Sequence, residues 1–207
     1  MGERAAFFYG TLMAPQVLHR VCYGSSKPPA YQSGLLTIRP AILPSYERHR
    51  VRHADYPAII PHAHSAVRGT VVTGLTDADI WRLDIFEGDD YERVTATAKI
   101  LVEVGDETGK GNVEGEEVRV ETYVWIAGED MLEKGEWDFA EFQKEKIGRW
   151  IGEEGEAEYA GRLSILEVDD AVKAQGKDPT GGRGRGGHIT NALEGQTALQ
   201  DVLKNAI

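Results

Sequence analysis

The sequence predicts an α+β domain, with a mostly antiparallel or mixed sheet and flanking helices, followed by a C-terminal extension. Two long segments, 94–104 and 118–126, carry apolar residues at every second position, which is typical of strands with one buried face. The segments 77–86 and 138–151 carry apolar residues at helical spacing. This alternation of strands and helices is too irregular for a doubly wound sheet, so an α+β arrangement is favoured.

The bulk composition limits the class of protein. The 207 residues are 41% hydrophobic and 28% charged, as in a globular protein, and no apolar run approaches the roughly 20 residues needed to cross a bilayer. The N-terminus lacks the apolar stretch of a secretory signal, and Cys22, the only cysteine, fits a reducing compartment. We therefore expect a cytoplasmic protein, monomeric or homodimeric, that does not act at a membrane.

The charge gives a further exclusion. A formal net charge of −11 argues against a nucleic-acid-binding surface, because phosphates require a basic face. A local basic group, Arg48, Arg50 and Arg52, leaves an anion site open, although a solvated loop is the favoured interpretation.

The first half of the chain begins with a buried strand. Ala5–Tyr9 is short, apolar and aromatic, and Gly10 ends it in a turn. Pro15 then suits the first turn of a short amphipathic helix. Segments 33–43 and 66–74 alternate loosely, with Gly69 and Gly74 as expected bulge or turn positions, and the proline-rich segment 56–61 between them is expected to be an extended loop or edge segment.

The next helix carries clear signals at both ends. Thr76 with Asp79 predicts an N-cap, and Gly88 predicts the end of a helix that covers about 77–86, so Glu87 lies in or just after the last turn. The alternation that follows predicts one apolar face from Val94 to Val104 and another from Val118 to Ile126. Residues 105–117, rich in Gly and Glu, are expected to form an exposed, mobile hairpin loop.

The last part of the domain is predicted to be helical. Asp138 and Glu141 resemble a capping box, Trp137 is placed to pack on Phe142, and the apolar stripe continues through Ile147, Trp150 and Ile151. We therefore divide the chain into a domain at 1–151 and an extension at 152–207. The extension is expected to contain a helix near 162–174, a flexible Gly-rich segment at 176–187 and a short helix from Ile189 onward.

Two features suggest chemistry. The turn Tyr9-Gly10-Thr11-Leu12 can present backbone N–H groups to an anion, because glycine leaves the approach open. Glu87 lies at the negative end of a helix beside Asp84, Asp89 and Asp90, an arrangement that disfavours its charged form and suits a carboxyl that both gives and takes a proton. Each feature taken alone is better explained as structural.

Together these features resemble the gamma-glutamylcyclotransferase-like superfamily, in its AIG2-like branch. The resemblance is carried by FFYGTLM, YPAIIP and VRGTVVTGLTDADIWRLDIFEGDDYERVTA, and it covers residues 6–126. It implies a small β-barrel-like α+β fold and a cytoplasmic, amide-cleaving cyclotransferase of glutathione-related metabolism, which releases 5-oxoproline from small gamma-glutamyl amines or peptides. It also implies that the family's glutamyl-binding turn corresponds to Tyr9, Gly10, Thr11 and Leu12, and its catalytic glutamate to Glu87.

The implied reaction needs neither a metal nor another cofactor, because the α-amine of the substrate attacks its own γ-carbonyl. Tyr91 and Arg93 begin a strand just after Glu87 and are candidates for substrate binding or for packing; Tyr123 is a weaker candidate, with packing favoured. Two further interpretations stay open: a non-catalytic ligand-binding module on the same fold, and an enzyme that removes a gamma-glutamyl group from a larger pathway intermediate. For His62 and His64, near His53 and Asp55, a metal site is less favoured than a loop.

Overall fold

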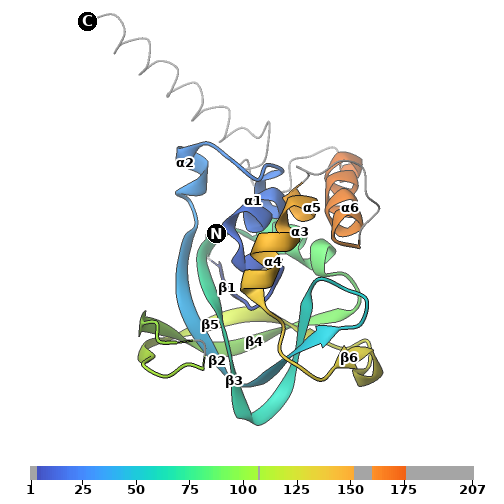
Figure 1. Ribbon diagram of the computed structural model, residues 1–207. Coiled ribbons are helices and arrows are strands. Elements are labelled where there is room, and N and C mark those ends of the chain that lie inside the picture. The colour runs from blue at the N-terminus through green and yellow to red at the C-terminus, as the bar shows by residue number, and fades with distance from the viewer. Residues whose placement is uncertain (1–3, 107, 152–159, 176–207) are drawn as a thin grey trace, which may run out of the picture.

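The computed structural model describes residues 4–106, 108–151 and 160–175, and Figure 1 shows their arrangement. Helices gather on one side of a strongly curved sheet. In chain order the elements are β1 (Arg4–Phe8), η1 (Thr11–Met13), α1 (Pro15–Tyr23), α2 (Ala30–Ser33), β2 (Thr37–Val51), β3 (Pro57–Leu75), α3 (Asp77–Glu87), β4 (Tyr91–Glu103), β5 (Val113–Trp125), η2 (Glu129–Met131), β6 (Leu132–Glu133), α4 (Phe139–Glu145), α5 (Ile147–Ile151) and α6 (Ala160–Gln175).

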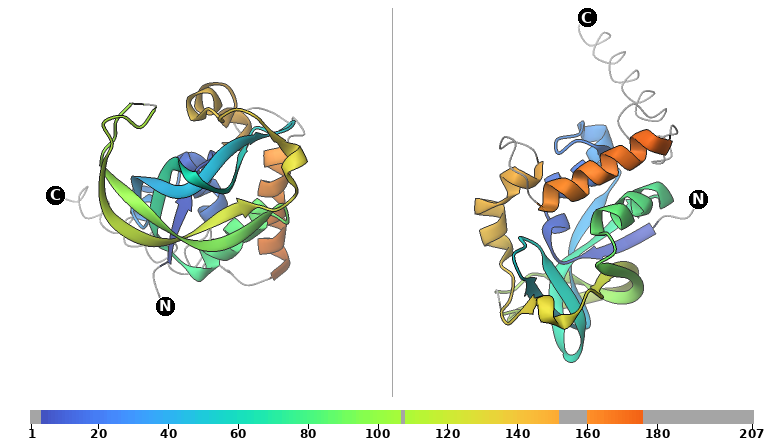
Figure 2. Two further views of the ribbon diagram at one scale, coloured as in Figure 1. Left: turned by 90° about the horizontal axis from the view of Figure 1, so that it is seen from below. Right: turned by 90° about the vertical axis from the view of Figure 1, so that its right-hand side faces the viewer.

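The sheet closes into a ring. Its order is β3-β1-β5-β4-β2-β6. A further pairing between β3 and β2 closes the ring, and β6 pairs with β2 outside it. All the pairings in the ring are antiparallel except β1 with β5, which is parallel. The strands wrap around a common interior (Figure 2, left). The predicted α+β class with a mixed, mostly antiparallel sheet is confirmed.

The two larger apolar layers among the described residues meet at β1, which contributes to both. Phe7 points into the ring, where it packs with side chains that include Leu43, Ile59 and Val71. Phe8 points the other way, into the layer between the ring and the helices, because neighbouring strand residues face opposite sides. The second layer also contains residues from the last described segments of the chain: Phe142, Trp150, Ile165 and Val168.

Several local predictions are confirmed. The strand before Gly10, the helix starting at Pro15 and the helix starting at Asp77 all form as expected. Thr76 and Asp79 make a reciprocal capping box, with Thr76 N–H donating to Asp79 Oδ2 over 2.8 Å. Gly74 is the extra residue of a bulge between β1 and β3; its φ of 87° is costly for other residues.

For 56–61 the structure selects the edge segment over the extended loop, because residues 57–61 pair with residues 46–50 of β2. Other predictions were wrong in detail. The single apolar face predicted for 94–104 breaks near Leu101, where the register with β5 shifts, so Leu101 is buried while Val102 and Val104 are exposed. Ile126 is also exposed, since it follows the end of β5.

The loop and helix boundaries also differ. The hairpin loop is shorter than 105–117, because β5 begins at Val113 and pairs with Glu103. The helix predicted after Asp138 is interrupted at Lys146, so α4 and α5 are separate. Asp138 does cap α4, and Trp137 does pack on Phe142, with ring centroids 5.5 Å apart.

The described part of the extension is α6, which lies beside α3 (Figure 2, right). The predictions for 176–187 and for the residues from Ile189 onward lie outside the described residues. Within the described ranges, none of the helices has the length and apolar character required to span a membrane.

Candidate active site

A cavity of about 230 Å³ lies between the ring and the helices. Seven of the eight residues singled out as site candidates from the sequence line it: Tyr9, Gly10, Thr11, Leu12, Glu87, Tyr91 and Tyr123. The remainder of the wall is formed by Phe8, Tyr56, Pro57, Phe86, Gly88, Asp89, Asp90, Trp150 and Glu167. Chain segments from both ends of the described sequence therefore meet at one site.

The glycine turn forms one side of the cavity. A Cβ atom on Gly10 would lie 2.8 Å from Pro57 Cδ, so a larger residue requires the turn or Pro57 to move. Thr11 and Leu12 begin η1, where the first N–H groups have no acceptor within the helix. Arg48 holds the backbone of the turn in place, because its Nη1 donates to the carbonyl oxygen of Tyr9 over 2.9 Å.

Glu87, the last residue of α3, lines the same cavity as this turn. Its carboxyl forms no hydrogen bond or ion pair with the described residues, and the residue is only partly exposed. Burial raises the pKa of Glu87 to about 8, and the negative charge of Asp84 contributes further. The predicted direction is confirmed, but burial is a larger cause than the acidic neighbours from which it was inferred.

Three tyrosines surround Glu87. The hydroxyl of Tyr9 donates to the Tyr123 carbonyl over 2.7 Å, and that of Tyr91 donates to the Pro57 carbonyl over 3.0 Å. Tyr123 donates to Asp84 Oδ1 over 2.9 Å. Burial is the main cause that raises the pKa of each phenol, so all three are neutral when Glu87 titrates.

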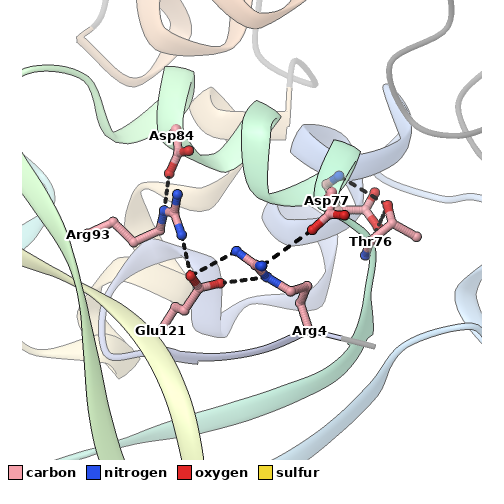
Figure 3. Close-up of polar contacts among 7 residues, drawn as sticks. Arg4, Thr76, Asp77, Asp84, Arg93 and Glu121 are labelled. Atoms are coloured by element: carbon pink, nitrogen blue, oxygen red, sulfur yellow. Dashed lines mark hydrogen bonds and ion pairs between the residues drawn. The ribbon is translucent and has the colours of Figure 1, made fainter. Parts of the chain in front are cut away.

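Arg93, the eighth candidate, does not line the cavity. Its Nε donates to Asp84 Oδ1 over 2.7 Å, and its Nη1 pairs with Glu121 (Figure 3). Glu121 also accepts two hydrogen bonds from Arg4, over 3.0 and 3.1 Å. Direct contact between Arg93 and a substrate is therefore not supported by its position, because carboxylates already occupy its guanidinium.

The sequence reasoning missed several wall residues. Trp150 was expected only to continue a helical stripe, yet its ring also borders the cavity and packs edge-on against Tyr56 and Phe86. Glu167 comes from α6 and is exposed at the wall. Neither position carries a local signal for a binding role, since only the path of the chain brings it there.

Other groups considered from the sequence are engaged elsewhere. Arg48 pairs with Glu136 over 2.5 Å, and Arg50 with Glu141 over 3.3 Å, so both arginines already have carboxylate partners. His62 contacts the Ser65 hydroxyl, while Asp55 pairs with Lys146.

The arrangement can support proton transfer beside a set of backbone N–H donors. The lining residues include four carboxylates, those of Glu87, Asp89, Asp90 and Glu167, and none of the described lining residues is Ser, Cys, Lys or Arg. Glu87 is the group best suited to exchange a proton near neutral pH, because its pKa lies close to that range.

Residues 6–139 match the family described as "Gamma-glutamyl cyclotransferase, AIG2-like". Two relatives from Arabidopsis thaliana are each 38% identical to this chain. Protein AIG2 C matches over 134 residues, which are 62% of this chain and 74% of the relative. AIG2-like protein B matches over 138 residues, which are 67% of this chain and 68% of the relative. A solution structure of an Arabidopsis thaliana protein is 27% identical, with a TM-score of 0.49 and coverage of 84% of this chain and 88% of that one. The match extends over more than half of the chain and confirms the resemblance seen over 6–126. This chain belongs to the AIG2-like gamma-glutamyl cyclotransferase family.

Proposed function

We propose that the protein is a cyclotransferase that releases 5-oxoproline from a gamma-glutamyl amine or peptide. The observation that carries the proposal is the unpartnered, partly buried carboxyl of Glu87, which lines the same cavity as the glycine turn. Membership of the family supports the class of reaction. A site that only bound its ligand would have no need of a carboxyl held near its protonation midpoint.

In the proposed reaction the substrate supplies its own nucleophile. The α-amine attacks the γ-carbonyl carbon, a new C–N bond closes a five-membered ring, and the bond from that carbon to the leaving nitrogen breaks. Glu87 takes a proton from the attacking amine and returns one to the leaving nitrogen, so the reaction consumes no water and no other reagent. A cavity that holds the substrate folded favours this ring closure, for which proximity can contribute roughly 7–11 kcal/mol.

The turn has two roles in the proposal. Its N–H groups at Thr11 and Leu12 bind the glutamyl portion or the oxygen that becomes negatively charged in the transition state, and one such donor contributes about 3–4 kcal/mol. Gly10 keeps the approach open, and the hydrogen bond from Arg48 to the Tyr9 carbonyl prevents the turn from moving away.

The test is a 5-oxoproline release assay with gamma-glutamyl amino acids, gamma-glutamyl amines and glutathione. We expect turnover of at least one class, and a loss of about 10²- to 10⁴-fold in Glu87→Gln. Glu114→Gln, whose carboxylate pairs with Lys99 on the surface, is the matched control and should behave as wild type.

Two results would contradict the proposal. Undiminished turnover by Glu87→Gln would remove Glu87 from the mechanism. Binding of a gamma-glutamyl compound without turnover of any substrate would favour the ligand-binding module on this fold.

A further inference from the structure

A chain of ion pairs ties α3 to the sheet at both ends. Arg4 of β1 lies 3.4 Å from Asp77 in the first turn of α3 and makes two hydrogen bonds to Glu121 of β5. Glu121 pairs with Arg93 of β4, and Arg93 donates to Asp84 in the last turn of α3 (Figure 3). The charges alternate along this path, from Asp77 to Asp84.

Asp84 is the member of this network nearest to the proposed proton carrier. It lies three residues before Glu87, and residues at that spacing are neighbours on one side of a helix. Its Oδ1 accepts from Arg93 of β4 over 2.7 Å and from the hydroxyl of Tyr123 of β5 over 2.9 Å. Two strands therefore hold its carboxylate in place, whereas that of Glu87 has no such partner among the described residues.

We propose that Asp84 is a positioning residue for Glu87: the network from Arg4 to Arg93 fixes the last turn of α3 against the sheet and keeps a negative charge beside the Glu87 carboxyl. The proposal rests on the function proposed for Glu87. It assigns Arg93 a role through Asp84 and not through the substrate. It also gives Tyr123 a second function, since the same hydroxyl that holds Asp84 belongs to a residue of the cavity wall.

The charges support this assignment. Arg93 compensates part of the charge of Asp84 but is shared with Glu121, so the network holds three carboxylates and two guanidinium groups. The repulsion from Asp84 acts in the same direction as burial and raises the pKa of Glu87. Other titratable groups face Glu87 from the elements around the cavity: Tyr9 after β1, Tyr56 before β3, Asp89 and Asp90 after α3, Tyr91 of β4, Tyr123 of β5 and Glu167 of α6.

Substitution of Asp84 and substitution of Arg93 should shift the protonation midpoint of Glu87 in opposite directions. This difference separates the proposed role from a purely structural one. Asp84→Asn removes the negative charge but keeps an acceptor for Tyr123, so the protonation midpoint of Glu87 should fall. Residues three apart on a helix are roughly 6 Å from each other, and a unit charge at that distance, at an effective dielectric constant of about 40–80, corresponds to a shift of about 0.5–1 pH unit. Arg93→Gln removes the compensating cation, so the midpoint should rise.

The experiment is a ¹³C NMR titration of the side-chain carboxyl of Glu87 in the full chain, with its signal assigned by its loss in Glu87→Gln. The pH profile of 5-oxoproline release is measured on the same proteins. Arg39→Gln and Glu116→Gln are matched controls, because they break an ion pair of 2.6 Å that contributes no residue to the cavity wall. Both controls should leave the midpoint unchanged.

Shifts of opposite sign in Asp84→Asn and Arg93→Gln support the proposal. Shifts of the same sign, or none, overturn it, because mere loosening of α3 would not distinguish the two charges. If the wild type releases no 5-oxoproline but the midpoint shifts as expected, the proposed function fails while the role of Asp84 in controlling Glu87 stands.

Discussion

Glu87→Gln should make the protein more stable at alkaline pH, and the gain should grow with pH. The pKa of Glu87 is raised from its ordinary value of 4.5 to about 8 in the folded chain. The folded state therefore holds this proton more tightly than the unfolded state does. Its contribution to stability is fully present below pH 4.5 and is lost as the pH rises through about 8, where the folded protein must place a charge in the cavity wall.

The magnitude follows from the difference between the two pKa values. Linkage gives an upper limit of about 3 kcal/mol for the lost stability at pH 7 and about 5 kcal/mol at pH 9, at roughly 1.4 kcal/mol per pKa unit. Because Glu87 is partly exposed, solvent screening reduces the effect, and we expect roughly half of these values. Glutamine stays neutral at every pH, so Glu87→Gln does not lose this stability as the pH rises.

The assay is urea unfolding of wild type and Glu87→Gln between pH 5 and pH 9. The free energy of unfolding of the variant should exceed that of wild type by an amount that grows by roughly 2–4 kcal/mol over this range. Glu114→Gln, at an exposed carboxylate, should show no such growth. A difference that does not depend on pH, or a wild type favoured at pH 9, would refute the reasoning.

Three further substitutions test the walls of the cavity. Gly10→Ala places a methyl group 2.8 Å from Pro57 Cδ and should lower the free energy of unfolding by about 1–3 kcal/mol in urea. It should also raise KM for any gamma-glutamyl substrate, and an unchanged KM would argue against the turn as a binding element. Trp150→Ala empties a buried aromatic site and should cost about 3–5 kcal/mol in the same unfolding assay. Glu167→Gln should lower kcat/KM about 2- to 5-fold for substrates whose leaving amine is cationic and should leave kcat/KM unchanged for substrates whose leaving amine is neutral. Asp170→Asn, on the same helix but outside the cavity wall, should leave kcat/KM unchanged for both kinds of substrate.

Features with local causes could be predicted from the sequence. The start and end of α3 follow from Thr76, Asp79 and Gly88, each of which acts within a few residues. The strand that ends at Gly10 follows in the same way from a short apolar run and a glycine. What failed depended on pairing between distant segments. The exposure of Val102 follows from a register shift against β5, and an alternating pattern within one strand does not reveal such a shift.

The same division applies to the candidate site. The glycine turn and Glu87 are marked by residue type and by position at the ends of elements, but these marks alone favoured a structural explanation, and it was their combination in a family pattern that singled them out. Trp150 and Glu167 resemble ordinary helix residues in sequence, and only tertiary packing makes them part of the wall. The partners of Arg93 were hidden for the same reason, because Asp84 and Glu121 lie 9 and 28 residues away along the chain.

The wall formed by Trp150 and Glu167 has a consequence for how this protein can diverge from its relatives. Both residues follow position 139, where the match to the family ends, while Gly10 and Glu87 lie within it. Part of the cavity wall is thus encoded outside the stretch that carries the glycine turn and Glu87. Mutations in α5 and α6 can reshape one side of the cavity while the turn and Glu87 stay unchanged, so we expect the range of ligands that the cavity accepts to vary independently of Glu87.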